Sequence, residues 1–263
     1  MRNIPFVKAS ACGNDFLLID GARAPQDVAA FTRRICDRHE GVGADGVAWM
    51  LAHFSADVEI RLINADGSAA EISGNGTRCV AAYVCQQQGK ERVSVMTGAG
   101  LKICTLTARR DSEYEFEIEM GEAAVEPELT LALKSGEVRG IPVSMGNPHF
   151  AVFVPEFSGN WQARSAEIQH SLRFPQGVNV EWVAPAGSKH DLRARFFERG
   201  AGETLSSGTG SCAAVAAAIA TGRAQSPVKL QAPGGAQTVR KEGNKIFLRG
   251  PARLLCQGEF FLS

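Results

Sequence analysis

The chain has 263 residues, of which 44% are hydrophobic and 21% charged, a composition typical of a globular protein long enough for two domains. Lysine plus arginine and aspartate plus glutamate both number 28, so no excess charge favours nucleic acid or a membrane surface as the partner. The first residues lack the apolar core of a signal peptide, and no apolar run approaches the roughly 20 residues that span a bilayer. We therefore predict a soluble cytoplasmic protein that acts on a small molecule.

The first predicted element is an amphipathic helix. Val28, Phe31 and Ile35 recur at helical spacing directly after Pro25 and Asp27, which favour a helix start. We expect this apolar stripe to cover one face of a sheet. The basic residues of the same stretch are predicted to form the solvated face of the helix: Arg33, Arg34 and Arg38.

Strand patterns follow this helix. Residues 58–62 and 114–120 alternate apolar with polar side chains, the pattern of a half-buried strand. Two further strand-like runs, residues 93–97 and 101–105, flank a Gly98-Ala99-Gly100 segment that favours a hairpin turn. These two runs should therefore pair antiparallel.

The second half of the chain repeats this style. Residues 149–154 and 192–196 are strand-like, and residues 242–245 form a predicted turn between two further strands. Between the halves, residues 121–140 change in composition, with several glutamates, a proline and a Ser-Gly pair. We place the domain junction there. The predicted domains are an N-terminal domain of residues 1–123, completed by residues 252–263, and a C-terminal domain of residues 124–251.

The seven cysteines do not form a metal-binding or disulfide pattern. Their number is odd, they are scattered without Cys-x-x-Cys pairs, and several lie in apolar runs. We predict that they are reduced and buried as small hydrophobic residues. No group of histidines and cysteines has metal-ligand spacing, so no metal is expected.

Two segments in different halves of the chain end alike, in Ser73-Gly74-Asn75-Gly76 and in Ser207-Gly208-Thr209-Gly210. An apolar run that contains alanine and cysteine follows each segment, which predicts a glycine-rich loop opening a helix. The two helical runs, residues 77–86 and 211–221, are apolar nearly all round. They should be the buried central helices of their domains.

A helix N-terminus carries unpaired N–H groups and partial positive charge, so it favours an anion. The candidate donors are Gly74, Asn75, Gly208 and Thr209, and two such helix ends are suited to hold one carboxylate. A single copy of the motif would more simply be a serine N-cap, whereas two copies after polar strand ends favour a site. Neither copy has a P-loop lysine or a dinucleotide fingerprint, which argues against a nucleotide.

Several motifs occur in the order found in diaminopimelate epimerases, and the chain resembles that family from Lys8 to about Cys212. The motifs are, in chain order, Gly13-Asn14-Asp15-Phe16, Asn64-Ala65-Asp66-Gly67, Gly74-Asn75-Gly76-Thr77-Arg78-Cys79, Gly146-Asn147-Pro148-His149, Gly177-Val178-Asn179, Glu198-Arg199-Gly200 and Gly208-Thr209-Gly210. The resemblance implies an α+β fold of two pseudo-symmetric domains, each a curled, mostly antiparallel sheet around a central helix. It implies an isomerase that converts LL-diaminopimelate to the meso form in lysine and cell-wall synthesis, without pyridoxal phosphate or another cofactor. It is also compatible with a homodimer.

This reaction needs a base on one face of the α-carbon and an acid on the other, while the charge of the carbanion spreads onto the carboxylate. Two helix N-termini in a closing cleft between the domains would stabilise that charge. The resemblance assigns the non-reacting amino-acid end of the substrate to Asn14, Asn64, Asn147, Asn179, Glu198 and Arg199. Amides, a carboxylate and a guanidinium are suited to a zwitterion. Without the resemblance, asparagines such as Asn14, Asn147 and Asn179 are equally well explained as turn residues.

The chain departs from the family at the two acid/base cysteines, which correspond to Ser73 and Ser207 here. The residues that assist the cysteines correspond to His149 and Glu198. A free thiol has a pKa of about 8.5, whereas a hydroxyl is a far weaker acid that needs an adjacent base. Three alternatives follow. Ser73 with His149 and Ser207 with Glu198 act as acid/base pairs, the scaffold serves another amino acid, or the chain binds its ligand without turnover.

Overall fold

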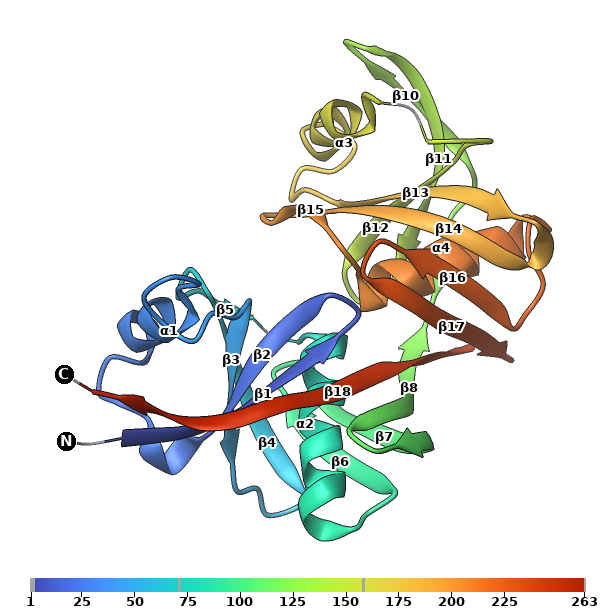
Figure 1. Ribbon diagram of the computed structural model, residues 1–263. Coiled ribbons are helices and arrows are strands. Elements are labelled where there is room, and N and C mark those ends of the chain that lie inside the picture. The colour runs from blue at the N-terminus through green and yellow to red at the C-terminus, as the bar shows by residue number, and fades with distance from the viewer. Residues whose placement is uncertain (1–2, 71, 158, 263) are drawn as a thin grey trace. The chain divides into compact units, whose positions relative to one another are not determined.

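The computed structural model describes residues 3–70, 72–157 and 159–262, and the chain divides into two compact units (Figure 1). Unit 1 comprises Met1–Ile118 and Gly250–Ser263, and unit 2 comprises Glu119–Arg249. The chain passes between the units within two strands, β8 (Glu113–Glu122) and β18 (Lys245–Phe261). No helix in the described part of the chain is both long enough and apolar enough to cross a membrane.

Unit 1 is mostly strand. Its elements, besides β8 and β18, are β1 (Asn3–Ala11), β2 (Asn14–Asp20), the 3-10 helix η1 (Gly21–Arg23), α1 (Val28–Cys36), β3 (Gly46–Leu51), β4 (Val58–Asn64), β5 (Ala69–Ala70), α2 (Gly74–Gln88), β6 (Arg92–Thr97) and β7 (Gly100–Arg110). Most neighbouring strands in the described part of unit 1 pair antiparallel, whereas β2 with β3 and β4 with β6 pair parallel. A helix makes each parallel crossover, α1 the first and α2 the second, as parallel pairing requires a long connection.

Unit 2 repeats this order of connections. Its elements are β9 (Ala124–Val125), β10 (Leu129–Leu133), β11 (Gly136–Ser144), β12 (Pro148–Phe153), α3 (Trp161–Gln169), β13 (Asn179–Ala186), β14 (Ser188–Glu198), β15 (Gly202–Thr204), α4 (Gly208–Ala220), β16 (Val228–Ala232) and β17 (Gly235–Glu242). The parallel pairs are β12 with β13, across α3, and β14 with β16, across α4. The expected α+β fold, with a mostly antiparallel sheet and a long helix in each half, is therefore confirmed.

The helices α2 and α4 are the central helices of their units. Helix α2 packs against β1, β2, β6 and β7, and α4 packs against strands that include β11, β12, β13 and β17. Both are buried almost all round, from Asn75 to Ala82 in α2 and from Gly210 to Ala218 in α4. The small side chains of α4 let the surrounding strands approach its backbone closely, as expected for a helix inside a core.

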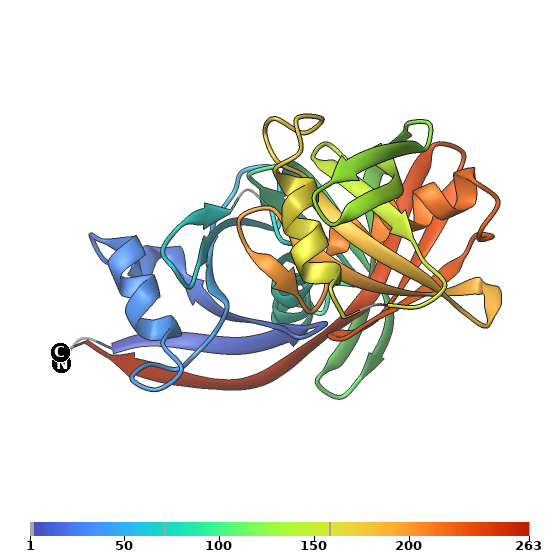
Figure 2. The same cartoon turned by 90° about the horizontal axis from the view of Figure 1, so that it is seen from above.

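The helices α1 and α3 are amphipathic covers on the strands of their own units. Helix α1 packs on β3 and β4, and α3 packs on β10, β13 and β14 (Figure 2). Helix α1 begins as predicted, because Asp27 Oδ1 accepts a hydrogen bond from Ala30 N at 2.9 Å and so caps the helix. Phe31 and Ile35 of the predicted stripe are buried in a core cluster with Leu17 and Trp49.

The strand predictions are also confirmed. The four alternating or strand-like segments lie in β4, β8, β12 and β14, and the predicted hairpin pairs β6 with β7, with Thr97 opposite Gly100. The turn at residues 242–245 joins β17 to β18, with Glu242 opposite Lys245. No disulfide joins the seven cysteines among the residues that the structure describes. Six of them are buried as predicted, whereas Cys256 is exposed, so the prediction of burial is wrong for that residue.

Candidate active site

Both serines of the repeated motif cap central helices. Ser73 is the N-cap of α2, and its Oγ accepts a hydrogen bond from Gly76 N at 3.1 Å. Ser207 is the N-cap of α4, and its Oγ accepts a hydrogen bond from Gly210 N at 3.2 Å. The first two amides of a helix lie outside its own hydrogen-bond ladder. Here they belong to Gly74, Asn75, Gly208 and Thr209, the predicted anion donors.

Ser207 also contacts a carboxylate, that of the residue which the resemblance pairs with it. Its Oγ donates a hydrogen bond to Glu198 Oε1 at 2.6 Å. Glu198 is the last residue of β14, and the chain turns back there into β15, with Gly202 opposite Glu198. This turn brings the carboxylate to the N-terminus of α4. The arrangement of a hydroxyl beside a base is the one that proton transfer at oxygen needs.

His149 has a partner on each ring nitrogen. Nδ1 lies 2.7 Å from Glu181 Oε1, and Nε2 lies 2.9 Å from Asn147 Oδ1. Both His149 and Glu181 are only 1% exposed. They come together because β12 and β13 pair parallel, with His149 opposite Asn179 and Ala151 opposite Glu181. The predicted helper residue is therefore held by a carboxylate of the neighbouring strand.

Sequence reasoning missed Glu181. Burial raises the pKa of its carboxyl from the ordinary 4.5 to about 7; the charge and hydrogen bond of His149 act against this shift, and the charge of Glu198 adds to it. Its Oε2 is buried and has no hydrogen-bond partner in the described part of the chain. One signal was present in the sequence, since Glu181 is a charged residue within the otherwise apolar run of residues 180–184.

Asn179 and Arg199, two of the predicted substrate-binding residues, are joined to each other. Asn179 Oδ1 accepts a hydrogen bond from Arg199 N at 2.9 Å, and Asn179 Nδ2 donates one to Pro148 O at 3.1 Å. The Arg199 side chain turns toward the loop before β13, where Nη1 donates to Gln176 O at 2.9 Å. Gly177 leaves room for it, because a Cβ there would lie 2.9 Å from Arg199 Cδ.

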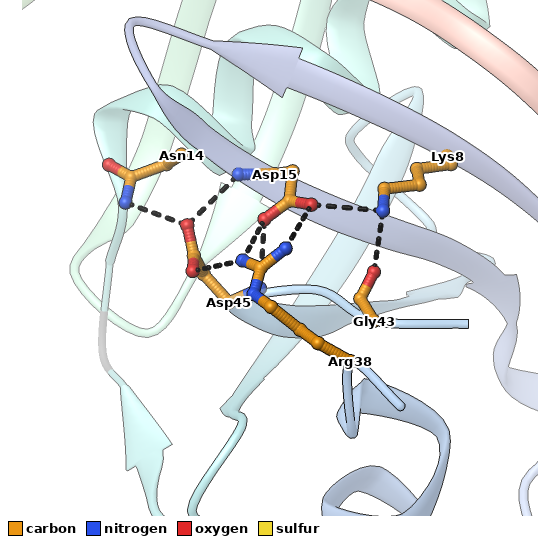
Figure 3. Close-up of polar contacts among 6 residues, drawn as sticks. All are labelled: Lys8, Asn14, Asp15, Arg38, Gly43 and Asp45. Carbon is orange, nitrogen blue, oxygen red and sulfur yellow. Dashed lines mark hydrogen bonds and ion pairs between the residues drawn. The ribbon is translucent and has the colours of Figure 1, made fainter. Parts of the chain in front are cut away.

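In unit 1, hydrogen bonds link the side chains of Asn14 and Asn75. Asn14 Oδ1 accepts a hydrogen bond from Asn75 Nδ2 at 2.6 Å, and Asn75 Oδ1 accepts one from the fully buried Arg78. Asn14 Nδ2 donates to Asp45 Oδ2 at 3.1 Å (Figure 3). These contacts fix which way both amides face. Asn14 Nδ2 carries two hydrogens, and its contact with Asp45 uses one of them.

A network of charged side chains supports Asn14 (Figure 3). Arg38 Nη2 lies 2.8 Å from Asp15 Oδ1 and 2.9 Å from Asp45 Oδ1, and Lys8 Nζ lies 3.0 Å from Asp15 Oδ2. Burial tends to raise the pKa of Asp15, but the hydrogen bonds from Arg38 and Lys8 outweigh it and hold that pKa below its ordinary value. The prediction for Arg38 is right about solvent, since its side chain is 56% exposed, but wrong about the helix. Helix α1 ends at Cys36, and Arg38 instead joins the two aspartates.

The remaining predicted residues lie at strand ends or loop ends. Asn64 is the last residue of β4, and its Nδ2 donates to Ser68 Oγ at 3.0 Å. Asn64 and Ser73 belong to unit 1, whereas His149 and Glu198 belong to unit 2. No cluster of three or more potential metal ligands occurs among the residues that the structure describes.

The comparisons with known proteins decide the family. The model of the family described as diaminopimelate epimerase matches residues 6–126 and 141–255. The chain belongs to the diaminopimelate epimerase family. The diaminopimelate epimerase of Pelotomaculum thermopropionicum is 36% identical over 275 residues, which cover 97% of this chain and 98% of that protein. The diaminopimelate epimerase of Methanothrix thermoacetophila is 37% identical over 273 residues, which cover 98% and 96% of the two chains.

Solved structures agree with the fold of this family. A phenazine biosynthesis protein of Bacillus anthracis matches over the whole of both chains with a TM-score of 0.76 at 15% identity. A hydroxyproline epimerase of Agrobacterium vitis, bound to trans-4-hydroxy-L-proline, matches over 99% of this chain and 91% of that one, with a TM-score of 0.73 at 19% identity. At these identities the likeness concerns the fold. Family membership makes the chain an isomerase of the epimerase type.

Proposed function

We propose that this chain interconverts LL- and meso-diaminopimelate without a cofactor, the substrate being taken from the name of its relatives. The observation that carries the proposal is the Ser207 hydroxyl, which lies at the N-terminus of a central helix and donates to the Glu198 carboxylate. A proton-accepting group beside amides that favour an anion is what removal of an α-proton requires.

The reaction breaks one C–H bond and forms another at the same carbon. A base takes the α-proton, the electron pair spreads into the carboxylate, and an acid then returns a proton from the opposite face. We assign one proton transfer to Ser207 with Glu198, and the other to Ser73 with His149. The four candidate amides at the starts of α2 and α4 are suited to stabilise the charge that develops on the carboxylate oxygens.

Serine makes each transfer harder than cysteine does. When Ser207 Oγ takes the α-proton, its own hydrogen moves to Glu198, and when it returns a proton to the carbanion, Glu198 gives that hydrogen back. Because a hydroxyl is a far weaker acid than a thiol, the step that forms alkoxide character costs more free energy. We therefore expect turnover that is slow compared with that of a cysteine enzyme.

The non-reacting end of the substrate is assigned to six polar residues: Asn14, Asn64, Asn147, Asn179, Glu198 and Arg199. A carboxylate needs donors, which the amides and the guanidinium supply, and an ammonium needs acceptors, which amide oxygens supply. Asn14 and Asn179 are already oriented by hydrogen bonds within the protein, so binding would cost little side-chain entropy there.

Exchange of the α-proton in deuterated water tests the proposal. With LL- or meso-diaminopimelate and a high protein concentration, proton NMR and mass spectrometry should show deuterium entering the α-position while both isomers form. Ser207→Ala should slow this exchange by about 100-fold, since general acid–base groups contribute at least that much. Ser188→Ala, on an exposed serine of the same unit, is the control and should exchange like the parent. Absence of exchange with either isomer would overturn the proposal.

A form that binds the amino acid without turnover is the second candidate. It is favoured by the caps, because both hydroxyls already stabilise helix ends and serve the fold without any chemistry. Such a protein would show a melting temperature that rises with diaminopimelate concentration, as mass action requires, but no deuterium incorporation.

Two further predictions rest on the resemblance. A homodimer is tested by sedimentation equilibrium of the purified protein, in which a single species of monomer mass would contradict it. A cytoplasmic location is tested by fractionation of the producing cells, in which recovery of the protein from another compartment would contradict it.

A further inference from the structure

Unit 2 contains a buried carboxylate–imidazole pair that the proposed proton transfers do not use directly. Glu181 Oε1 lies 2.7 Å from His149 Nδ1, and the two side chains are 1% and 0% exposed. The backbone amide of Phe150 also donates to the Glu181 carboxylate. A carboxylate so far from water is costly unless it meets a hydrogen-bond donor or a positive charge, and the imidazole is the group that meets it.

The strand register places Glu181 on the side of β13 that faces α4. Val180 and Trp182 of β13 belong to the core cluster under α3, so the alternate residues Asn179 and Glu181 face the opposite side of the strand. That side is the one covered by α4. A Cβ added to Gly210 would lie 2.9 Å from Glu181 Oε1 and 2.9 Å from Ser207 Oγ, so the carboxylate lies against the first turn of α4 beside Ser207.

The two ring nitrogens of His149 are therefore not equivalent. Nδ1 faces the Glu181 carboxylate. When this carboxylate is ionised it has no hydrogen to donate, so the hydrogen of the neutral ring is held on Nδ1. Nε2 faces the side-chain amide of Asn147, at 2.9 Å from Oδ1. An amide accepts from N–H through its oxygen and donates to a bare nitrogen through its NH2 group, so Asn147 is compatible with both states of Nε2.

We propose that Glu181 is a positioning residue for His149, which holds the proton on Nδ1 and leaves Nε2 as the nitrogen that gains and loses a proton. The carboxylate also stabilises the imidazolium that exists while Nε2 is protonated. The same side-chain pair fixes the ring plane, because the carboxylate is itself held between β12 and the first turn of α4. The catalytic meaning of this assignment rests on the proposed function, in which His149 assists one proton transfer.

The test is independent of turnover. Long-range proton–nitrogen NMR spectra of protein labelled with 15N in its histidines report which ring nitrogen carries the hydrogen, and loss of one set of signals in His149→Gln assigns those of His149. Well above pH 7, where the Glu181 carboxyl is ionised, the parent should show a protonated Nδ1. In Glu181→Gln the amide can donate to Nδ1, so the hydrogen should move to Nε2. Glu126→Gln, on an exposed carboxylate of the same unit, is the matched control and should leave His149 unchanged.

A bare His149 Nδ1 in the parent overturns the inference, and this result does not depend on the folding of Glu181→Gln. An unchanged His149 spectrum in a folded Glu181→Gln protein overturns it as well. Where α-proton exchange is measurable, Glu181→Gln should lower its rate constant by about 100-fold and leave the KM within about twofold. If His149 behaves as stated but no isomer exchanges deuterium, the proposed function fails while the assignment of Glu181 stands.

Discussion

Ser207 donates its hydroxyl hydrogen to Glu198 Oε1 at 2.6 Å while its oxygen accepts the amide hydrogen of Gly210. The two contacts give this side chain two roles. The amide contact stabilises the start of α4, and the carboxylate contact directs the hydroxyl hydrogen toward a base. A thiol in the same position would have the same base beside it, and it would ionise far more readily.

Restoring both thiols should therefore raise turnover. We expect Ser73→Cys combined with Ser207→Cys to increase the rate of α-proton exchange in diaminopimelate by about 100-fold or more, within the usual contribution of a general acid–base group. Each single substitution should give much less, because inversion needs a group on both faces of the α-carbon. Deuterium incorporation at saturating substrate measures the rates. A double variant no faster than the parent would show that the obstacle lies outside these two side chains.

The matched glycines Gly76 and Gly210 should respond differently to alanine. A Cβ at Gly210 would lie 2.9 Å from both Ser207 Oγ and Glu181 Oε1, whereas one at Gly76 would meet nothing closer than the Ser73 Cβ at 3.4 Å. Gly210→Ala should destabilise the protein by about 1–3 kcal/mol, as overpacking does. Gly76→Ala should be neutral or stabilise by up to about 1 kcal/mol through helix propensity. Thermal unfolding of the two variants compares them, and equal shifts would contradict the asymmetry.

The charged network behind Asn14 should affect ligand binding. Asp45→Asn weakens the acceptor that orients the Asn14 amide and removes one partner of Arg38. Loss of one charge-assisted hydrogen bond corresponds to about 1.5 kcal/mol, so the Kd for diaminopimelate should rise about tenfold in titration calorimetry. Glu126→Gln, at an exposed ion pair with Arg173, is the control and should bind like the parent. A Kd unchanged by Asp45→Asn would show that the orientation of Asn14 does not contribute to ligand binding.

Glu181 should make the stability of the parent depend on pH. Its pKa is raised by burial from 4.5 to about 7, so below pH 4.5 the carboxyl is protonated in both states and the stability it contributes is fully present. Between pH 4.5 and pH 7 the unfolded chain loses this proton before the folded chain does, and stability falls. The free energy of unfolding of the parent, relative to that of Glu181→Gln, should therefore decrease by up to about 3 kcal/mol over this interval. Urea titrations at several pH values measure the free energy of unfolding of both proteins. If the two free energies change in parallel with pH, the raised pKa of Glu181 is contradicted.

Local patterns predicted the framework of the fold well. The strict alternation of residues 58–62 and 114–120, the helical spacing in α1 and the glycine turn between β6 and β7 all appear in the structure. Each of these signals comes from neighbours in the sequence, whose periodicity follows from backbone geometry. The pairing of Ser207 with Glu198 was expected from the family resemblance, not from a local pattern.

The supporting residues of the site were not foreseen, for a physical reason. Glu181 meets His149 across 32 residues, and Asp45 meets Asn14 across 31, each pair joined by a parallel strand crossover whose register no local pattern encodes. Arg38 was assigned to a solvated face because charge near an amphipathic helix is usually exposed. Its two aspartate partners become visible only when the loop after α1 is placed beside β2.

The pairing of β1 with β18 has a consequence for synthesis of the chain. Asn3 lies opposite Phe261, so the first strand of unit 1 waits for the last one to leave the ribosome. Unit 2 needs only Glu119–Arg249 and has its complete sequence earlier. Because domains fold as units during translation, the unit that begins the chain is the last to be able to close its sheet. A chain truncated after residue 249 would therefore contain all of unit 2 together with a unit 1 that still exposes the edge of β1 to other chains.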